Sequence, residues 1–297
     1  MKAKRRFNIW LWVLLCVPCL LASCDHDVHD GEEEGGLSVS LTWADEADQG
    51  TEVKDVKLWI FDADKGSLIE EKHYGSTEEV ASQRFQLPEG TYRILTTTNL
   101  TEPFFISEQT RSLTNWNKIL RGLTNPKEVR NNAYFGVTDV KIDNKEGNYV
   151  VQNPIRSVLA ELTIVIENIP KGTEMSGKAL DAAWCLFPTQ KNGDGDYGLP
   201  SIEPAEVELP TLLATESTLK SEVIRLMPTI QGSPASHIYL RLQLPDKTLQ
   251  EFDITAPKMN VGGKYELRFK YEEMQPKMNL EATINGWTNL NNEVETK

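Results

Sequence analysis

The stretch Val158-Leu-Ala-Glu-Leu-Thr-Ile-Val-Ile-Glu167 decides the fold class of this chain. Its apolar residues recur at every second position, and Glu161, Thr163 and Glu167 lie between them. Because successive side chains of a β-strand point to opposite faces, this period of two predicts a strand with one buried face and one solvated face. An amphipathic helix would instead repeat its apolar residues every three to four positions.

The same alternation continues from this stretch toward both ends of the chain. In Val56–Phe61 apolar residues fill both faces, which indicates a strand buried on both sides. The segment Asp62–Ser67 has turn composition and precedes a return strand that begins at Leu68. The other predicted strands are Leu37–Trp43, Phe85–Leu87, Tyr92–Thr98, Tyr134–Ile142, Ala182–Phe187, Glu222–Met227, His237–Leu244, Phe252–Ile254, Lys264–Tyr271 and Leu280–Ile284.

Short strands with few helices predict an all-β protein of two consecutive antiparallel β-sandwich domains with one or two short helices. The helical candidate is Ser112–Leu123, whose apolar residues have helical spacing. The Gly-, Pro- and Glu-rich segment Lys191–Ser217 is expected to be an exposed excursion. Turn residues around Gly147 and Asn153 favour a boundary there, so the expected domains are residues 37–152 and 153–297.

A secretory signal is predicted at residues 1–23. Basic residues fill the first positions, and the apolar run Ile9–Ala22 is shorter than a membrane-spanning helix and contains Pro18. Its end, Leu21-Ala-Ser-Cys24, resembles the lipobox of bacterial lipoproteins. The resemblance implies cleavage between Ser23 and Cys24, followed by acylation of Cys24. The alternative is a soluble secreted protein cut near Ser23, with an unmodified thiol at Cys24.

The segment after Cys24 is expected to be a flexible acidic tether over residues 24–36. Loss of four basic residues with the signal changes 31 basic residues to 27 against 44 acidic ones, a net charge of −17. Such a charge excludes nucleic acid as a partner and repels anionic lipid headgroups, so an acyl chain must hold the membrane. Once Cys24 is acylated, Cys185 is the one cysteine left, which excludes an intrachain disulfide.

The sequence contains no motif for catalysis and predicts no enzyme, no cofactor apart from the lipid on Cys24, and no small-molecule substrate. His26 and His29 lie among acidic residues, but a charged spacer explains them without a metal ion. Asp62–Ser67 and Asn192–Glu203 partly resemble calcium-binding loops but lack the required turn glycine. Both are therefore predicted to be ordinary turns.

Several spaced segments resemble the FimB-type fimbrial anchor lipoproteins. Those quoted in order are Val56-Lys-Leu-Trp-Ile-Phe-Asp62, Gly90-Thr-Tyr-Arg-Ile-Leu-Thr-Thr-Thr-Asn99, Asn153-Pro-Ile-Arg156, Ala160-Glu-Leu-Thr-Ile164 and Ile284-Asn-Gly-Trp287. The resemblance covers roughly residues 37–287 and implies two transthyretin-like domains. It places the chain in a superfamily of pilins whose stalk members lose their lipidated first strand to an arginine-directed protease and then accept a strand from the next subunit.

After Cys24 the first lysine is Lys54 and the first arginine is Arg84. By the pattern of the superfamily, the first strand therefore stays attached to its lipid. The resemblance implies an anchor subunit at the fimbrium base, on the outer membrane and exposed at the cell surface, which holds a pilin by strand exchange and limits fimbrial length. The candidate donor strand carries Leu280, Ala282 and Ile284, although pairing of this strand within its own domain is an equal alternative.

Two other functions remain open from the sequence. The chain could be a surface lipoprotein that binds a polysaccharide or a host ligand, in which case exposed aromatic residues should gather on one face. It could also be a polymerising stalk or tip pilin of the same superfamily.

Overall fold

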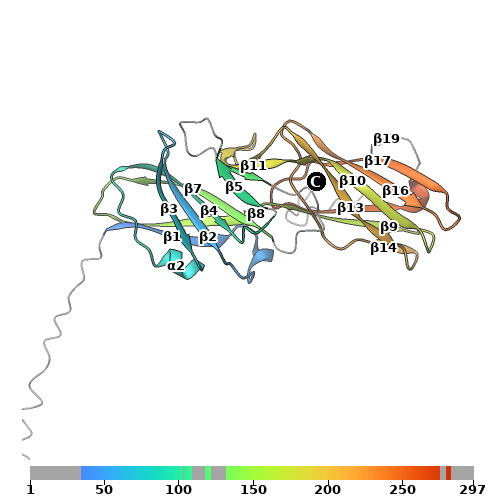
Figure 1. The fold of residues 1–297 in the computed structure, drawn as a ribbon, viewed down its shortest axis with the longest axis horizontal. Coiled ribbons are helices and arrows are strands. Elements are labelled where there is room, and N and C mark those ends of the chain that lie inside the picture. The colour runs from blue at the N-terminus through green and yellow to red at the C-terminus, as the bar shows by residue number, and fades with distance from the viewer. Residues whose placement is uncertain (1–34, 103, 109–117, 122–131, 275–278, 282–297) are drawn as a thin grey trace, which may run out of the picture.

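The computed structural model describes residues 35–102, 104–108, 118–121, 132–274 and 279–281. These residues form four β-sheets and one short α-helix, which confirms the predicted all-β fold class. The molecule is elongated, with β1–β4 and β7 toward one end, β9, β10, β13, β14, β16 and β17 toward the other, and β5 and β11 between them (Figure 1). Most neighbouring strands are antiparallel, but β1–β8, β9–β18 and β17–β19 are parallel pairs, which the sequence did not predict.

The first sheet contains six strands in the order β1-β8-β7-β4-β2-β3. The predicted burial of β2 on both sides is confirmed. Leu58 and Ile60 pack in a core that also contains Val80 of helix α2, and Trp59 and Phe61 pack on the opposite face. The strands are β1 Gly36–Trp43, β2 Val56–Asp62, β3 Leu68–Tyr74, β4 Gly90–Thr98, β7 Tyr134–Ile142 and β8 Asn148–Ser157, and α2 is Thr77–Ala81.

Two further sheets enclose the core of the second half. Strand β9, Ala160–Glu167, has the alternation that the sequence predicted, with Leu162, Ile164 and Ile166 fully buried. On one side β9 pairs with β14 Thr218–Lys220 and β15 Ile224–Leu226, and it also pairs with β18 Lys264–Lys270. The other sheet has the order β13-β10-β16-β17-β19, with β13 Pro204–Leu213, β10 Glu174–Ala183, β16 Ala235–Gln243, β17 Leu249–Pro257 and β19 Asn279–Glu281.

The fourth sheet is built from both halves of the chain. Its order is β12-β11-β6-β5, with β5 Phe105–Glu108, β6 Lys118–Arg121, β11 Cys185–Lys191 and β12 Tyr197–Pro200. The link between the halves is the antiparallel pairing of β6 with β11, in which Leu120 is opposite Leu186. A division into domains at residue 152 stays a prediction, and β8 runs across that position.

The expectation that Lys191–Ser217 is an exposed excursion is wrong. The segment contains β12 and the ten-residue strand β13, whose Val207 and Leu209 are buried. Its prolines suggested a loop, but Pro204 and Pro210 lie on an edge strand, where a missing N–H need not break a ladder. The alternation of Val207 and Leu209 with Glu206 and Glu208 was the overlooked strand signal.

The predicted helix Ser112–Leu123 is wrong over the part of it that the structure describes, because Lys118–Arg121 forms strand β6. The remaining positions of that segment lie outside the described residues. The observed helix α2 begins after Ser76, whose side chain accepts a hydrogen bond from the Glu79 amide. The Glu79 carboxylate in turn accepts from the Gly75 amide at 2.7 Å. This reciprocal arrangement is close to a capping box, and Ser76-Thr-Glu-Glu79 is its sequence signature.

A polar cluster also fastens the six-stranded sheet to β11 and β12. Arg93 on β4 donates two hydrogen bonds to Asp139 on β7, at 2.8 and 3.1 Å. The Tyr197 hydroxyl donates to the same carboxylate at 2.6 Å, and the Arg93 guanidinium lies 5.0 Å from the centre of the Tyr197 ring. Burial raises the pKa of Asp139, but the hydrogen bonds from Arg93 and Tyr197 outweigh it, so the net pKa lies below 3.8. Burial and the bond to Asp139 raise the pKa of Tyr197 to about 12.

We expect Ile164→Ala to lower the free energy of unfolding by about 2–5 kcal/mol, because it leaves a cavity in the core between the two sheets. Urea denaturation followed by circular dichroism measures this change. The matched control is Thr163→Ala, on the other face of β9, which should cost less than about 1 kcal/mol. Equal losses from the two variants would contradict the assignment of the buried face.

We expect Asp139→Asn to lower the free energy of unfolding at pH 7, because it weakens the hydrogen bonds from Arg93 and Tyr197. The loss should be only about 1 kcal/mol, because the carboxylate is about one-third exposed and water screens the pair. The folded-state pKa of Asp139 is depressed, so its contribution is present above 3.8 and is lost as the pH falls below that value. Denaturation at pH 7 and pH 3 should therefore give a smaller difference at pH 3. The control Asp143→Asn, at an exposed ion pair, should change stability at neither pH.

Candidate functional site

The predicted lipidation site, Cys24, and the cleavage site between Ser23 and Cys24 lie outside the described residues. The structure does place the point where the segment that follows them joins the fold. Gly35 is the first described residue of the chain, and β1 begins at Gly36. Strand β1 is therefore the element through which an N-terminal lipid would be connected to the body of the protein.

Strand β1 is an integral part of the first core. It pairs in parallel with β8 over its whole length, from Gly36 opposite Asn148 to Trp43 opposite Ile155. Leu37 and Val39 are fully buried in the same cluster as Leu58 and Ile60. Removal of β1 would expose this apolar surface and one edge of β8, which is the kind of surface that takes up a complementary strand.

The far end of β1 is fastened to the second half by Lys264 of β18. The Lys264 ammonium lies 2.7 Å from a carboxylate oxygen of Asp45 and 3.8 Å from one of Asp48. The hydrogen bond from Lys264 holds the pKa of Asp45 below its ordinary value, whereas burial raises the pKa of Asp48. All three side chains are at least three-quarters buried, so this contact joins β1 to the second half in a largely desolvated place.

The candidate donor strand is described only in part. Leu280 belongs to β19, which forms the edge of the five-stranded sheet and pairs in parallel with β17, with Leu280 opposite Ile254. Ala282 and Ile284 lie outside the described residues. Internal pairing of β19 is the alternative to donation of this strand, and donation to a pilin stays a proposal.

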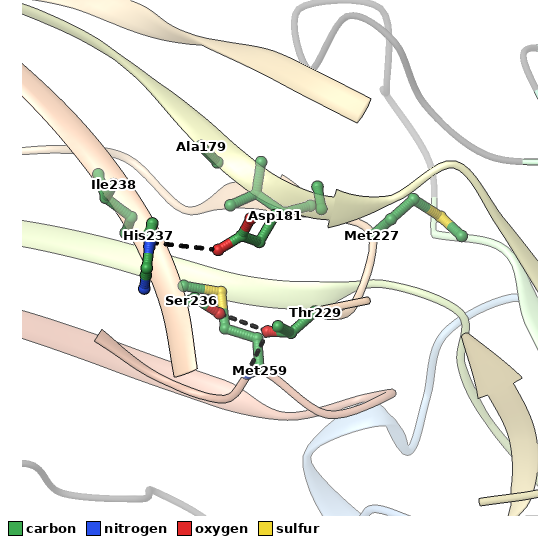
Figure 2. Close-up of a pocket in the computed structure, with 10 residues that line it drawn as sticks. Ala179, Asp181, Met227, Thr229, Ser236, His237, Ile238 and Met259 are labelled. Carbon is green, nitrogen blue, oxygen red and sulfur yellow. Dashed lines mark hydrogen bonds and ion pairs between the residues drawn. The ribbon is translucent and has the colours of Figure 1, made fainter. Parts of the chain in front are cut away.

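A small cavity in the second half brings together side-chain types that occur in hydrolases, but its geometry does not suit catalysis (Figure 2). Its volume of about 10 Å³ is roughly that needed for a single water molecule. The Nδ1 atom of His237 lies 3.7 Å from a carboxylate oxygen of Asp181. The Ser236 hydroxyl, however, is hydrogen-bonded to the Thr229 hydroxyl and not to His237. Because neighbours on a strand point to opposite faces, Ser236 and His237 do not form a nucleophile–base pair.

A larger cleft, of about 520 Å³, lies where the loops before β2 and after β4 meet Arg225 of β15. Asn99 fixes its walls, because it accepts a hydrogen bond from the Lys54 amide at 2.7 Å and donates one to the Glu52 carbonyl at 3.0 Å. Two carboxylates, Glu52 and Asp55, balance two cations, Lys54 and Arg225. The cleft therefore has the chemistry to hydrogen-bond a neutral polar molecule rather than an ion.

Asp62–Ser67 forms a turn as predicted, and so does Asn192–Asp196 of the second segment, whereas Tyr197–Pro200 of that segment forms β12. The Asn192 side-chain oxygen accepts hydrogen bonds from the amides of Asp194 and Asp196, each at 2.9 Å, and Asp62 caps the amides of Asp64 and Lys65 in the same way. Across the described ranges no group of three or more His, Cys, Asp or Glu side chains is placed to hold a metal ion. No helix within the described part of the chain is long and apolar enough to cross a membrane.

Sequence reasoning missed the residues that join β1 and the first sheet to the second half. Lys264, Arg93 and Tyr197 occupy ordinary strand positions, and each acts through a partner far away in the sequence. No local pattern could have identified them, because isolated charges on strands usually face solvent.

Solved structures with the same fold come from fimbrial and adhesin proteins. The fimbrial anchor protein Mfa2 from Porphyromonas gingivalis matches with a TM-score of 0.54 and 15% identity, over 79% of this chain and 90% of that one. A protein of Bacteroides thetaiotaomicron described as an adhesin matches with a TM-score of 0.55 and 10% identity, over 80% of this chain and 92% of that one. At such low identity these matches establish the fold alone.

A third match, to a protein of Bacteroides thetaiotaomicron described as polysaccharide-binding, has a TM-score of 0.52 and 8% identity, over 81% of this chain and 94% of that one. No match is found among curated proteins.

The family is identified by a sequence match and not by these structures. The model of the fimbrillin-A associated anchor proteins Mfa1 and Mfa2 matches residues 24–293, which is nearly the whole chain after the predicted signal. These are structural proteins of fimbriae at the cell surface and not enzymes. The chain, with its elongated all-β body and its first strand built into that body, belongs to the family of fimbrillin-A associated anchor proteins.

Proposed function

We propose that this protein is an outer-membrane lipoprotein that anchors a fimbria to the cell through acyl chains on Cys24. The observation that carries the proposal is the joint occurrence of a lipobox at Leu21–Cys24 and a first strand, β1, that is built into the fold within a fimbrial anchor family. One acyl chain gives only marginal membrane binding, so a stable anchor needs at least two. No cofactor other than this covalent lipid is part of the proposal.

Retention of β1 is the step that makes this subunit an anchor rather than a link of the shaft. No arginine lies between Cys24 and the end of β1, so an arginine-directed protease has no site there. The burial of Leu37 and Val39 supports the same conclusion, because the strand fills the groove that a neighbouring subunit would otherwise occupy. A subunit with a filled groove ends a filament and limits its length.

The fimbrial partner is proposed to be a pilin that receives a strand from this protein. The candidate is the segment that begins with β19 and contains Leu280, Ala282 and Ile284. Its sheet position supports the proposal, because within the described residues β19 lies at the edge of the five-stranded sheet, beside β17. An edge strand has one free side, so it costs less to exchange than a central strand does.

A surface binding module for polysaccharide is the second candidate function. The polar cleft of about 520 Å³ favours it, because amides and balanced charges can hydrogen-bond sugar hydroxyl groups. One solved structure of the same fold comes from a protein described as polysaccharide-binding. Thermal stabilisation by glycans, together with fimbriae that do not depend on the protein, would favour this function over anchoring.

We expect deletion of the gene to release fimbriae from the cells, and the released fimbriae should be longer than those of the parent strain. Pilin is quantified in the cell pellet and in the culture medium, and filament length is measured by electron microscopy. Complementation with Cys24→Ala should restore the protein but not the attachment, because the acyl anchor is lost. Unchanged attachment and length on deletion would contradict the anchor function.

We expect Thr51→Arg to create a cleavage site in the exposed loop after β1. In cells that produce the arginine-directed protease, N-terminal sequencing should then find a chain that begins at Glu52, and more fimbriae should be shed. Thr51→Lys is the matched control, because it adds the same charge without an arginine. Identical processing of both variants would contradict the role assigned to the missing arginine.

A further inference from the structure

The chain enters the fold through a narrow passage that only glycine fits. A Cβ atom added to Gly35 would lie 2.3 Å from the carbonyl oxygen of Glu146, and one on Gly36 would lie 3.1 Å from that of Phe85. Gly36 also has a φ of 149°, a conformation that residues with a side chain rarely adopt. The two glycines that end the acidic tether in the sequence are therefore part of the folded body.

Backbone hydrogen bonds hold Gly36 and Leu37 from both sides. The Gly36 amide donates to the Gly147 carbonyl at 2.8 Å, on the side where β8 begins. On the other side Leu37 and Phe85 exchange two backbone hydrogen bonds, at 3.0 and 2.9 Å. Phe85 was predicted to begin a strand, but it forms only this isolated bridge.

Two side chains complete the grip. The Gln86 amide group donates a hydrogen bond to the Gly35 carbonyl. The Ser38 hydroxyl donates to the Ala81 carbonyl at the end of α2, at 3.1 Å. We use the name entry clamp for Gly35–Ser38 together with the four residues that hold it, Ala81, Phe85, Gln86 and Gly147.

The direction of β1 decides how this clamp responds to tension. Strand β1 lies along the long axis of the molecule, with its N-terminal end at the extremity remote from the second half (Figure 1). Tension between the N-terminus and the second half therefore acts along β1. Because β1 and β8 are parallel and in register over eight residues, such tension loads their hydrogen bonds together in shear. Tension across the strands would instead break these bonds one after another.

We propose that the entry clamp resists tension and holds β1 in its sheet while the fimbria pulls on the lipid anchor. This inference rests on the proposed anchor function for the origin of the load. The clamp holds the chain at its first folded residues, where Leu37 and Phe85 already belong to the first core. The Lys264 contact to Asp45 and Asp48 then holds the other end of β1.

Single-molecule force spectroscopy tests the clamp on residues 24–297, the proposed mature chain. Cys24 and Thr248→Cys serve as thiol handles, because Thr248 is exposed on the β16–β17 turn and Cys185 is buried. Gln86→Ala removes one clamp hydrogen bond from an exposed side chain, and Gly36→Ala crowds the passage. At fixed load we expect each change to raise the rate of unfolding, by about tenfold for Gln86→Ala, the factor that one lost hydrogen bond allows.

The matched control for Gly36→Ala is Gly50→Ala. Gly50 also has a positive φ, of 89°, but a Cβ atom there meets nothing within 4 Å. Gly50→Ala therefore introduces the strain of a positive φ at a position outside the entry clamp. Its unfolding rate under load should stay close to that of the parent, even where its melting temperature falls. Equal rates for Gln86→Ala and the parent, or for the two glycine variants, would overturn the proposal.

A second pulling direction separates a clamp from a general loss of stability. When the first handle is moved from Cys24 to Asp64→Cys, an exposed position on the turn between β2 and β3, the load no longer enters through the clamp residues. The clamp variants should then unfold under load at the rate of their parent. Because the experiment uses purified protein without fimbriae, its failure is distinct from a failure of the anchor function, which fimbrial shedding reports.

Discussion

One of the three buried apolar clusters among the described residues extends from the first half of the chain into the second, and the connection between the halves depends on it. Phe135 of β7 and Leu120 of β6 belong to the same buried cluster as Leu162 and Leu186. The Phe135 ring packs so closely against β12 that a Cβ atom on Gly198 would lie 2.6 Å from it. Burial of one such ring contributes about 1.5–3 kcal/mol. Together with the β6–β11 pairing, this core joins the halves by the same forces that hold each half together.

The N-terminal strand β1 is also held by partners that are distant in the sequence. Strand β1 is early in the sequence, but its partner β8 begins more than a hundred residues later, and its far end meets Lys264 of β18. Parallel strands need a crossover connection of about a dozen residues or more, because a tight turn reverses the chain direction, and here the connection is far longer. The strand is therefore held by residues from both halves, and a load on the N-terminus is shared by the whole body rather than by a local hairpin.

Charged side chains on the surface and charged side chains at the contacts between the two halves have different roles. The full chain has a net charge of −13, so acidic side chains outnumber basic ones. The cations at the contacts between the halves are mostly buried. Lys264 meets Asp45 and Asp48 across the two halves, where most of the water is excluded, whereas Arg93 and Asp139 pair within the first sheet and contact the second half through the Tyr197 hydroxyl. The Lys264 contact selects one arrangement of the halves, since a displaced ammonium would leave the two carboxylates largely buried without a partner.

The sequence by itself determined the elements whose signal is local. The period of two in β9, the apolar faces of β2 and the turn at Asp62 all depend on neighbouring residues, and so did the lipobox and the missing arginine that led to the anchor hypothesis. Tertiary structure alone decided what depends on distant partners. These features are the parallel pairing of β1 with β8, the strand β6 in place of a helix, the shared sheet and the entry clamp at Gly35 and Gly36. The physical reason is that side-chain alternation is fixed by backbone geometry within a strand, whereas the choice of neighbouring strand is fixed by which surfaces bury each other once the chain has folded.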